Sequence, residues 1–347
     1  MRLTIPQPQL LRTLQMVEHV VNDRSTLPIL ANVLLEASPT ELTLTATDLD
    51  VGIRCRFPLA PPVEQGAVTL PARKLTTIVR ELAEEAVTLE ARKNHTAVLN
   101  CGASTFRIPG LPAEDFPTLP DQRAADRLTI PQAVLKALIS KTAYAMSIEE
   151  TRFILNGALL TTQMPAPIGK PKGGQQDLVL VATDGRRLAI AHGPLSGAPR
   201  TPFTAVIPAK TIRELGRLLE SEDPEEMTIA PLQENQVAFS FGPVMVVTRL
   251  IEGQFPAFDK VIPAPAKRAF SCNREGLLNA VRRASLMTTA TSQAVVFELE
   301  RNRLVVSKES AELGSAREEL PVEYDGEPVS AAFNPEFWLD LAKALEA

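Results

Sequence analysis

The sequence predicts an α+β fold made of three repeated domains, because long segments recur in the same order along the chain. Residues 5–11 recur as residues 130–136, and residues 29–35 recur as residues 154–160, in both cases 125 positions later. The pairs Thr47-Asp48 and Phe116-Pro117 return as Thr183-Asp184 and Phe255-Pro256. A weaker third copy begins at Asn273. A repeat with so long a period indicates an array of similar domains.

Each copy follows the order helix, strands, helix, strands. In the first copy, residues 7–21 carry apolar side chains at helical spacing behind Pro6, a residue suited to a first helical turn. Apolar and β-branched runs between turn residues predict strands at 30–35, 42–47, 51–57, 87–91, 97–101 and 104–108. Residues 72–82 are the second predicted helix, and the second copy repeats both helices at 132–146 and 210–219. Antiparallel sheets are the expected arrangement for such closely spaced strands.

Joins rich in Pro, Ala and charge, at 118–127 and 259–268, divide the chain into domains of residues 1–121, 127–252 and 266–347. An insertion at 163–176, rich in Gly, Pro and Lys, predicts a solvated hairpin loop, with a partner contact through its lysines as the alternative. The third copy ends 13 residues after Asn334, whereas the first two continue for 46 and 48 residues past Pro71 and Pro208. We therefore expect the third domain to lack its last strands, roughly 30 to 35 residues.

The composition is typical of a water-soluble globular protein, with 45% hydrophobic and 22% charged residues among 347 and a net charge of −5. Cys55, Cys101 and Cys272 form no CxxC pair, which predicts buried free thiols and a reducing compartment. The first residues lack the apolar core of a signal peptide, and no apolar run reaches membrane-spanning length. We expect a cytoplasmic protein with no membrane partner.

The residues offer little for catalysis. Three histidines lie on different predicted elements, and there is no phosphate-binding glycine loop or nucleophile elbow. Asp48 and Asp50 could form a catalytic or metal-binding pair, but their place between two strands favours a turn. The sequence predicts a non-enzymatic protein with no metal and no cofactor.

Basic residues recur on the predicted helices, although the whole chain is acidic. The predicted helices carry Arg73, Lys74 and Arg80, then Lys136 and Lys141, then Lys210, Arg213 and Arg217, and finally Arg282 and Arg283. Acidic residues concentrate at helix ends and in hairpins instead. One basic helix face is usually only solvated, but recurrence in register across the copies favours a shared positive surface.

Several longer strings match a known family. They are RSTLPIL at 24–30, PARK at 71–74, LPAEDFP at 111–117, RFILNG at 152–157, ATDGRRLA at 182–189 and GQFP at 253–256. Together and in this order, they are far more specific than any one short motif. Over essentially its whole length, the chain resembles the bacterial sliding clamp, the β subunit of DNA polymerase III.

The resemblance implies three clamp domains in each chain and a head-to-tail homodimer that closes a six-domain ring. Helices would line the hole, sheets would form the outside, and double-stranded DNA would pass through without sequence-specific contacts. Arg24, Arg73, Lys74 and Arg152 match the DNA-facing positions of the family. Helix position adds the other basic residues to the predicted DNA surface: Arg80, Lys136, Lys141, Lys210, Arg213, Arg217, Arg282 and Arg283.

The resemblance also implies a pocket between domains 2 and 3 that holds short peptide motifs from the replicative polymerase, the clamp loader and repair proteins. The matching residues are Leu155, Thr183, Gly185, Arg187, Leu188, Pro256 and Val261, with Arg186 and Lys260 in the same strings. In the family the chain's last strand completes this pocket, so an early chain end would leave it incomplete. The dimer contact would join Ser104, Phe106 and Ile108 of domain 1 to elements near Leu286 and residues 304–306 of domain 3.

The leading interpretation is therefore a processivity factor that encircles DNA and tethers a polymerase. The alternative is a clamp-like protein with an unfinished third domain, which cannot encircle DNA and acts only as a binding module or decoy.

Overall fold

The structure is a computed structural model that describes residues 1–22, 25–83, 86–120, 127–163, 176–197, 201–220, 225–264, 266 and 268–345. In these residues, domain 1 contains two helices and eight strands. They are β1 (Arg2–Pro6), α1 (Gln7–Val17), β2 (Asn32–Ala37), β3 (Glu41–Thr47), β4 (Val51–Pro58), β5 (Gly66–Pro71), α2 (Ala72–Arg80), β6 (Ala86–Ala91), β7 (Thr96–Cys101) and β8 (Ser104–Pro109).

Domain 2 repeats this order of elements. It contains β9 (Leu128–Pro131), α3 (Gln132–Thr142), β10 (Gly157–Thr161), β11 (Asp177–Thr183), β12 (Leu188–Pro194), β13 (Thr204–Pro208), α4 (Ala209–Leu218), β14 (Glu226–Leu232), β15 (Gln236–Phe241) and β16 (Val244–Arg249). Short 3₁₀ turns follow α1 and α3, and others lie at Pro28–Ala31, Ala113–Asp115, Glu150–Leu155 and Phe258–Val261.

Domain 3 follows the same plan as far as its second helix. It contains β17 (Ser271–Cys272), α5 (Arg274–Ser285), β18 (Val295–Glu300), β19 (Arg303–Ser310), β20 (Gly314–Glu323), β21 (Val329–Phe333) and α6 (Pro335–Ala344). The predicted order of helices and strands is confirmed in domains 1 and 2 and, as far as its second helix, in domain 3, except that a short strand also precedes the first helix of each copy. The insertion at 164–175 and the join at 121–126 lie outside the described residues.

In the described residues, the helices begin in two ways. Helices α1 to α4 each follow a strand that ends in proline, whose fixed φ suits entry into a helix. Helices α5 and α6 begin instead after Asn273 and Asn334, and the side chains of these residues accept hydrogen bonds from the amides of Gly276 and Glu336. The repeat therefore preserves the position of each helix while changing the chemistry of its start.

Domains 1 and 2 share one eight-stranded sheet with the order β5-β2-β3-β4-β16-β15-β14-β9. Strand β4 of domain 1 pairs antiparallel with β16 of domain 2, in a register that places Ile53 opposite Val246. The other sheets have the orders β1-β6-β7-β8, β12-β11-β10-β13 and β17-β20-β19-β18-β21. Backbone hydrogen bonds therefore join the first two domains directly.

Three clusters of buried side chains hold the molecule together. The largest runs through domains 1 and 2 and includes Leu14, Ile53 and Phe239. The second lies in domain 3 around Val281 and Phe297. The third lies on the outer face of the β10–β13 sheet, where Leu155 and Phe255 meet. Domain 3 therefore has its own core, while domains 1 and 2 have a common one.

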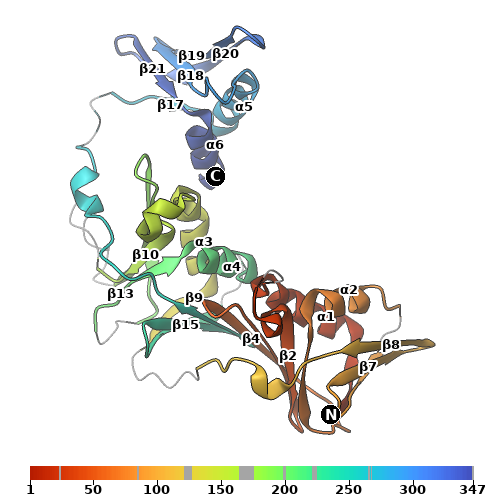
Figure 1. The fold of residues 1–347 in the computed structure, drawn as a ribbon. Coiled ribbons are helices and arrows are strands. Elements are labelled where there is room, and N and C mark those ends of the chain that lie inside the picture. Colours follow the sequence, from red (N-terminus) through yellow and green to blue (C-terminus); the bar gives the residue numbers. More distant parts are fainter. Residues whose placement is uncertain are drawn as a thin grey trace.

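Figure 1 shows the three domains along an arc, with the helices on the concave side and the sheets on the convex side. The chain ends in α6, which is the part of domain 3 that faces domain 2. This confirms the predicted fold class and the predicted placement of helices inside and sheets outside.

Candidate functional site

The concave helical face carries exposed basic side chains. Arg73, Lys74 and Arg80 are exposed on α2, Lys141 on α3, Arg213 on α4, and Arg282 on α5. Helices α2 and α3 contain no acidic residue. A face of this kind attracts phosphate groups without distinguishing one base from another.

Three of the predicted DNA-facing residues instead hold helices and domains together. The Lys136 ammonium donates to the carbonyl of Gly216, which joins α3 to α4. Lys210 pairs with Asp48 of domain 1 and donates to the Val20 carbonyl at 3.3 Å. Arg217 donates to the carbonyls of Gln15 and Met16 at 3.2 and 2.8 Å. The nitrogens of these three residues serve contacts between elements, and their role at DNA stays a prediction.

Two more predicted positions are engaged in ion pairs. Arg283 binds Glu318 through both its Nε and one Nη atom, and these hydrogen bonds hold the pKa of the Glu318 carboxyl below its usual value. Arg152 lies beside the turn between β11 and β12. It donates to the Asp184 carbonyl at 2.8 Å and pairs with Glu149 at 3.2 Å. Arg24 lies outside the described residues.

The Asp48-Leu49-Asp50 segment is a structural turn, as its place between strands predicted. One oxygen of Asp48 accepts from the amides of Asp50 and Val51, at 3.1 and 2.8 Å. The other oxygen pairs with Lys210. Both carboxylate oxygens of Asp48 are therefore engaged in holding the fold, which agrees with the structural reading of this segment.

The repeat of this turn in domain 2 carries four of the predicted pocket residues: Thr183, Gly185, Arg186 and Arg187. One oxygen of Asp184 accepts from the amides of Arg186 and Arg187, at 2.8 and 3.0 Å, and the Thr183 hydroxyl donates to the Arg187 carbonyl at 2.7 Å. Gly185 adopts a φ of +85°, a left-handed conformation that glycine tolerates best. These bonds fix the turn that presents Gly185 and Arg186 to solvent.

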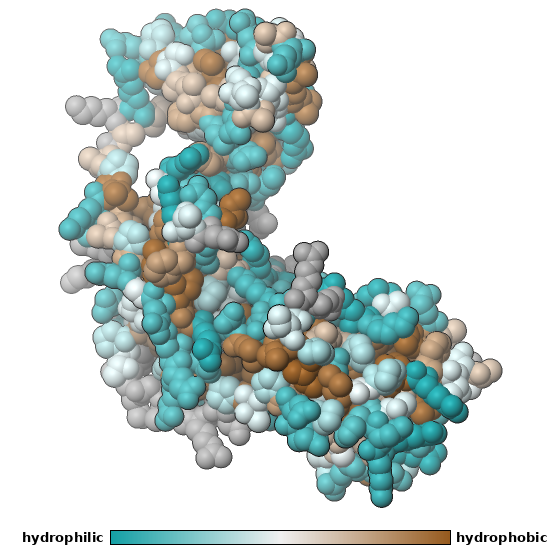
Figure 2. All heavy atoms as spheres, viewed as in Figure 1, coloured by the Kyte–Doolittle hydropathy of each residue, from teal (hydrophilic) through white to brown (hydrophobic). Residues whose placement is uncertain are grey.

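The structure brings most of the predicted pocket residues together at the seam of domains 2 and 3. Leu155 and Leu188 pack in the outer cluster of domain 2 with Phe255 and Phe258 of the linker. Val261 follows on the same linker and is 68% exposed. Pro256 and Lys260 are also exposed there. Figure 2 shows hydrophobic atoms gathered on this outer side of domain 2 and along the linker to domain 3.

Sequence reasoning missed an apolar groove that adjoins this cluster. It has a volume of about 670 Å³ and is lined by Leu159, Val206, Ile251 and Phe255 together with polar linker residues. Its walls come from β10, β13 and the segment after β16, which are distant in sequence. No local motif marks such a groove, since it exists only when the linker folds back on the sheet.

Of the two predicted dimer surfaces, the one in domain 1 lies on a strand with an open edge. Strand β8 is at the end of its sheet and, within the described residues, pairs only with β7. Ser104 is exposed and Phe106 is 36% exposed, but Ile108 is only 4% exposed and packs in the domain 1 core. The Ile108 side chain therefore serves the domain 1 core, and a partner contact at this position stays a prediction that would rest on the backbone of β8.

In domain 3, Leu286 at the end of α5 is 69% exposed, as a contact residue should be. Residues 304–306 lie on β19, which is paired on both sides, so they cannot accept another strand. Strand β20 is paired with β19 along its whole length and with β17 only at its last residues. Sequence periodicity does not show which strand of a sheet lies at its edge, because that depends on pairing between strands.

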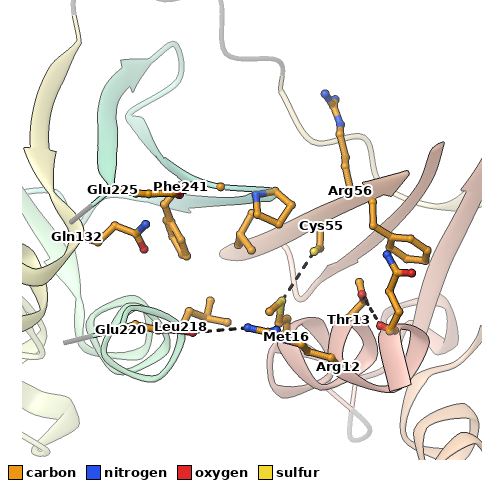
Figure 3. A pocket seen from close by; sticks show the side chains of 15 residues that line it. Arg12, Thr13, Met16, Cys55, Arg56, Gln132, Leu218, Glu220, Glu225 and Phe241 are labelled. Carbon is orange, nitrogen blue, oxygen red and sulfur yellow. Dashed lines mark hydrogen bonds and ion pairs between the residues drawn. The ribbon is translucent and has the colours of Figure 1, made fainter. Parts of the chain in front are cut away.

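A pocket of about 370 Å³ lies at the junction of domains 1 and 2. Figure 3 shows α1 and α4 below it and the strands of the shared sheet above it. Met16, Cys55 and Phe241 form its apolar side, and the Arg12–Glu220 ion pair at 3.6 Å lies at its helical side. The Cys55 thiol lies 3.9 Å from the Met16 sulfur.

Cys55 should be almost inert in the folded protein. Burial raises the pKa of its thiol from 9.0 to about 11, so at pH 8 its thiolate is about 100-fold rarer than that of an ordinary thiol. We expect iodoacetamide at pH 8 to leave Cys55 unmodified in native buffer and to alkylate it in urea, as read by peptide mass spectrometry. The partly exposed Cys272 is the internal comparison. Rapid native alkylation of Cys55 would contradict this burial.

The same shift predicts how stability depends on pH. Because the folded pKa is the higher one, the buried thiol stabilises the fold fully below pH 9 and loses this contribution as pH rises toward 11.

The described residues gather no group of three or more His, Cys, Asp or Glu that could hold a metal ion. No helix in the described part of the chain is long and apolar enough to cross a membrane.

Three family models match consecutive parts of the chain. They are the N-terminal, central and C-terminal domains of the DNA polymerase III beta subunit, at residues 1–120, 129–257 and 259–347. The beta sliding clamp of Caulobacter vibrioides is 36% identical, with 98% of this chain and 90% of the relative covered. That of Escherichia coli K12 is 32% identical, with 100% and 91% covered.

Solved structures match over the same length of the chain. A crystal structure of a DnaN sliding clamp from Pseudomonas aeruginosa bound to griselimycin has a TM-score of 0.90 and 31% identity, and covers 100% of this chain and 90% of its own. A griselimycin-bound clamp from Bartonella birtlesii has a TM-score of 0.90 and 32% identity, with 100% and 91% covered. The similarity therefore extends over all three domains.

Proposed function

We propose that this chain, which belongs to the bacterial DNA polymerase III β subunit family of sliding clamps and is thus a polymerase processivity factor, closes a ring around double-stranded DNA as a head-to-tail homodimer. The alternative of a decoy that cannot encircle DNA is disfavoured, because the relatives match along the whole chain. The proposed role needs no catalytic residue and no cofactor, and its place is the cytoplasm.

The pairing of β4 with β16 inside the chain carries this proposal. Strand β8 holds in domain 1 the place that β16 holds in domain 2, and β20 holds in domain 3 the place that β4 holds in domain 1. Each of these two counterparts has an open edge within the described residues. If β8 of one chain pairs with β20 of another as β4 pairs with β16, two chains form two equal contacts and a closed ring.

The concave helical face then becomes the lining of the hole. Its exposed basic residues (Arg73, Lys74, Arg80, Lys141, Arg213 and Arg282) supply sequence-independent attraction to phosphates, while the net negative chain disfavours DNA on the outside. Moderate attraction permits sliding, and closure of the ring provides retention. DNA therefore stays bound because of topology, with electrostatics in a supporting role.

The seam of domains 2 and 3 is the proposed docking site for clients. The outer apolar cluster and its groove, next to the fixed Thr183–Leu188 turn, suit a short peptide with apolar anchors. We assign to this site the peptide motifs of the replicative polymerase, the clamp loader and repair proteins. We refer to it below as the client groove.

Retention on circular and linear DNA tests the proposed function. After loading by a clamp loader onto a nicked circular duplex and removal of free protein, we expect most of the protein to stay with the circle through gel filtration. Cutting the circle with a restriction enzyme should release it within minutes, because the ring slides off an end. The measurement is the fraction of labelled protein that elutes with DNA. Equal loss from both forms would mean that the protein does not bind topologically.

A further inference from the structure

Arg187 connects domain 2 to domain 3 through four side chains. Its Nε donates to Asp184 at 3.0 Å within its own turn, and its Nη1 donates to Asp340 of α6 at 2.8 Å. Its guanidinium lies 5.4 Å from the centre of the Tyr144 ring and 4.8 Å from that of Phe337. We call Arg187, Asp184, Asp340, Tyr144 and Phe337 the Arg187 clasp.

The contacts of the Arg187 clasp are strong ones, although the clasp lies at the surface. A planar guanidinium holds its carboxylate partners in fixed directions while its flat face lies against aromatic rings, whereas an ammonium has no rigid fork and no flat face. The Arg187 side chain is only 21% exposed, so solvent screens these contacts less than it screens an open ion pair. The resemblance placed Arg187 among the residues that touch the client, but here its nitrogens are committed to the seam.

Asp184 links the clasp to the client groove. Its Oδ2 binds Arg187, and its Oδ1 accepts the amides of Arg186 and Arg187 that shape the turn. The position of Arg187 is therefore linked to that of the turn, which leads into Leu188, and Leu188 packs against the apolar cluster of the client groove. Asp340 contributes to this arrangement from domain 3 without belonging to the turn itself.

The seam between domains 1 and 2 shows why the clasp matters. There, the equivalent turn has the same amide bonds to Asp48, but a shared sheet also fixes the two domains. Between domains 2 and 3, no strand pairing joins the described residues, and the helical contact is that of α3 with α6. The orientation of α6 against the client groove therefore depends strongly on the clasp.

We propose that Asp340 is a positioning residue for the client groove, which it holds in its binding geometry through Arg187 and Asp184. This rests on the proposed function of the groove. Occupancy of the groove and the orientation of domain 3 are then coupled, since both depend on the same guanidinium.

Griselimycin is a suitable probe, because sliding clamps from two bacteria hold it in crystal structures. We expect Asp340→Asn to raise its Kd three- to tenfold at low salt in isothermal titration calorimetry, with a smaller difference at 0.5 M salt. Asp340→Glu should restore most of the affinity. Glu336→Gln is the matched control, because Glu336 is an exposed acid on the same helix that lies outside the clasp.

Amide hydrogen exchange at Gly185 and Arg186 separates positioning from a general loss of structure. Faster exchange there in Asp340→Asn, with unchanged fluorescence of Trp338 on α6, would support the proposal. If Asp340→Asn disturbs α6, Arg187→Lys removes the two-carboxylate bridge from the domain 2 side and should act in the same way.

The outcomes distinguish the two proposals. If the wild-type protein binds griselimycin and Asp340→Asn binds it equally well, the positioning role is overturned. If the wild-type protein does not bind it, the client groove fails this test, and the exchange rates alone then decide the positioning role. Unchanged exchange at Gly185 and Arg186 would overturn it in that case as well.

Discussion

Arg107→Pro should convert the dimer into monomers while domain 1 stays folded. The two-residue turn between Cys101 and Ser104 sets the register of β7 and β8, in which Arg107 lies opposite Val98. Pairs alternate between hydrogen-bonded and non-hydrogen-bonded along such a hairpin, so the Arg107 amide points away from β7 toward the open edge. Proline removes that donor and places its ring where a partner strand must approach.

We expect a loss on the order of 3 kcal/mol at each contact, a factor of about 100. The ring has two such contacts, so the dimer dissociation constant should rise by about 10⁴-fold. Sedimentation equilibrium would then report the 37.7 kDa mass of one chain where the wild-type protein shows twice that mass. The variant should also be lost from circular DNA as fast as the wild type is lost from linear DNA. Arg107→Ala is the control, because it removes the side chain but keeps the amide. A dimer of undiminished affinity in Arg107→Pro would show that β8 does not pair across the interface.

The order of elements and the three domains could be predicted from the sequence because the signals are local and occur more than once. Apolar spacing behind Pro6 and Pro131 identifies α1 and α3, and alternation with turn residues identifies β3 and β4. The Asp48 turn was also predictable, since Asp between two strands commonly caps the backbone of the next residues.

Short strands and long-range contacts could not be predicted in this way. Strand β1 has only five residues, and its partner β6 lies some 80 residues away, so no local pattern reveals the pair. The pairing of β4 with β16 is equally non-local. The same holds for the site, because the roles of Lys210 and Arg187 depend on carboxylates from other domains. A charged side chain on a helix looks the same in sequence whether it faces DNA or closes a seam.

Phe239→Ala should unfold domains 1 and 2 much more easily and leave domain 3 nearly unchanged. Phe239 is fully buried in β15, inside the cluster that runs through the first two domains. Truncation of a buried phenylalanine costs about 3–5 kcal/mol, since it removes apolar contacts and leaves a cavity. Domain 3 has a separate core around Phe297, with no strand from the other domains in its sheet.

The only tryptophan of the chain makes this separation measurable. Trp338 stacks on Phe297 at 5.0 Å and packs edge-on against Phe333 at 5.7 Å, so its fluorescence reports on domain 3. In urea we expect the fluorescence transition to occur at a different concentration from the circular dichroism transition. Phe239→Ala should move the main dichroism transition to lower urea and leave the fluorescence midpoint in place. A parallel shift of both would show that all three domains unfold as one unit, and that the helical contacts and the Arg187 clasp couple domain 3 to the shared sheet as firmly as strand pairing would.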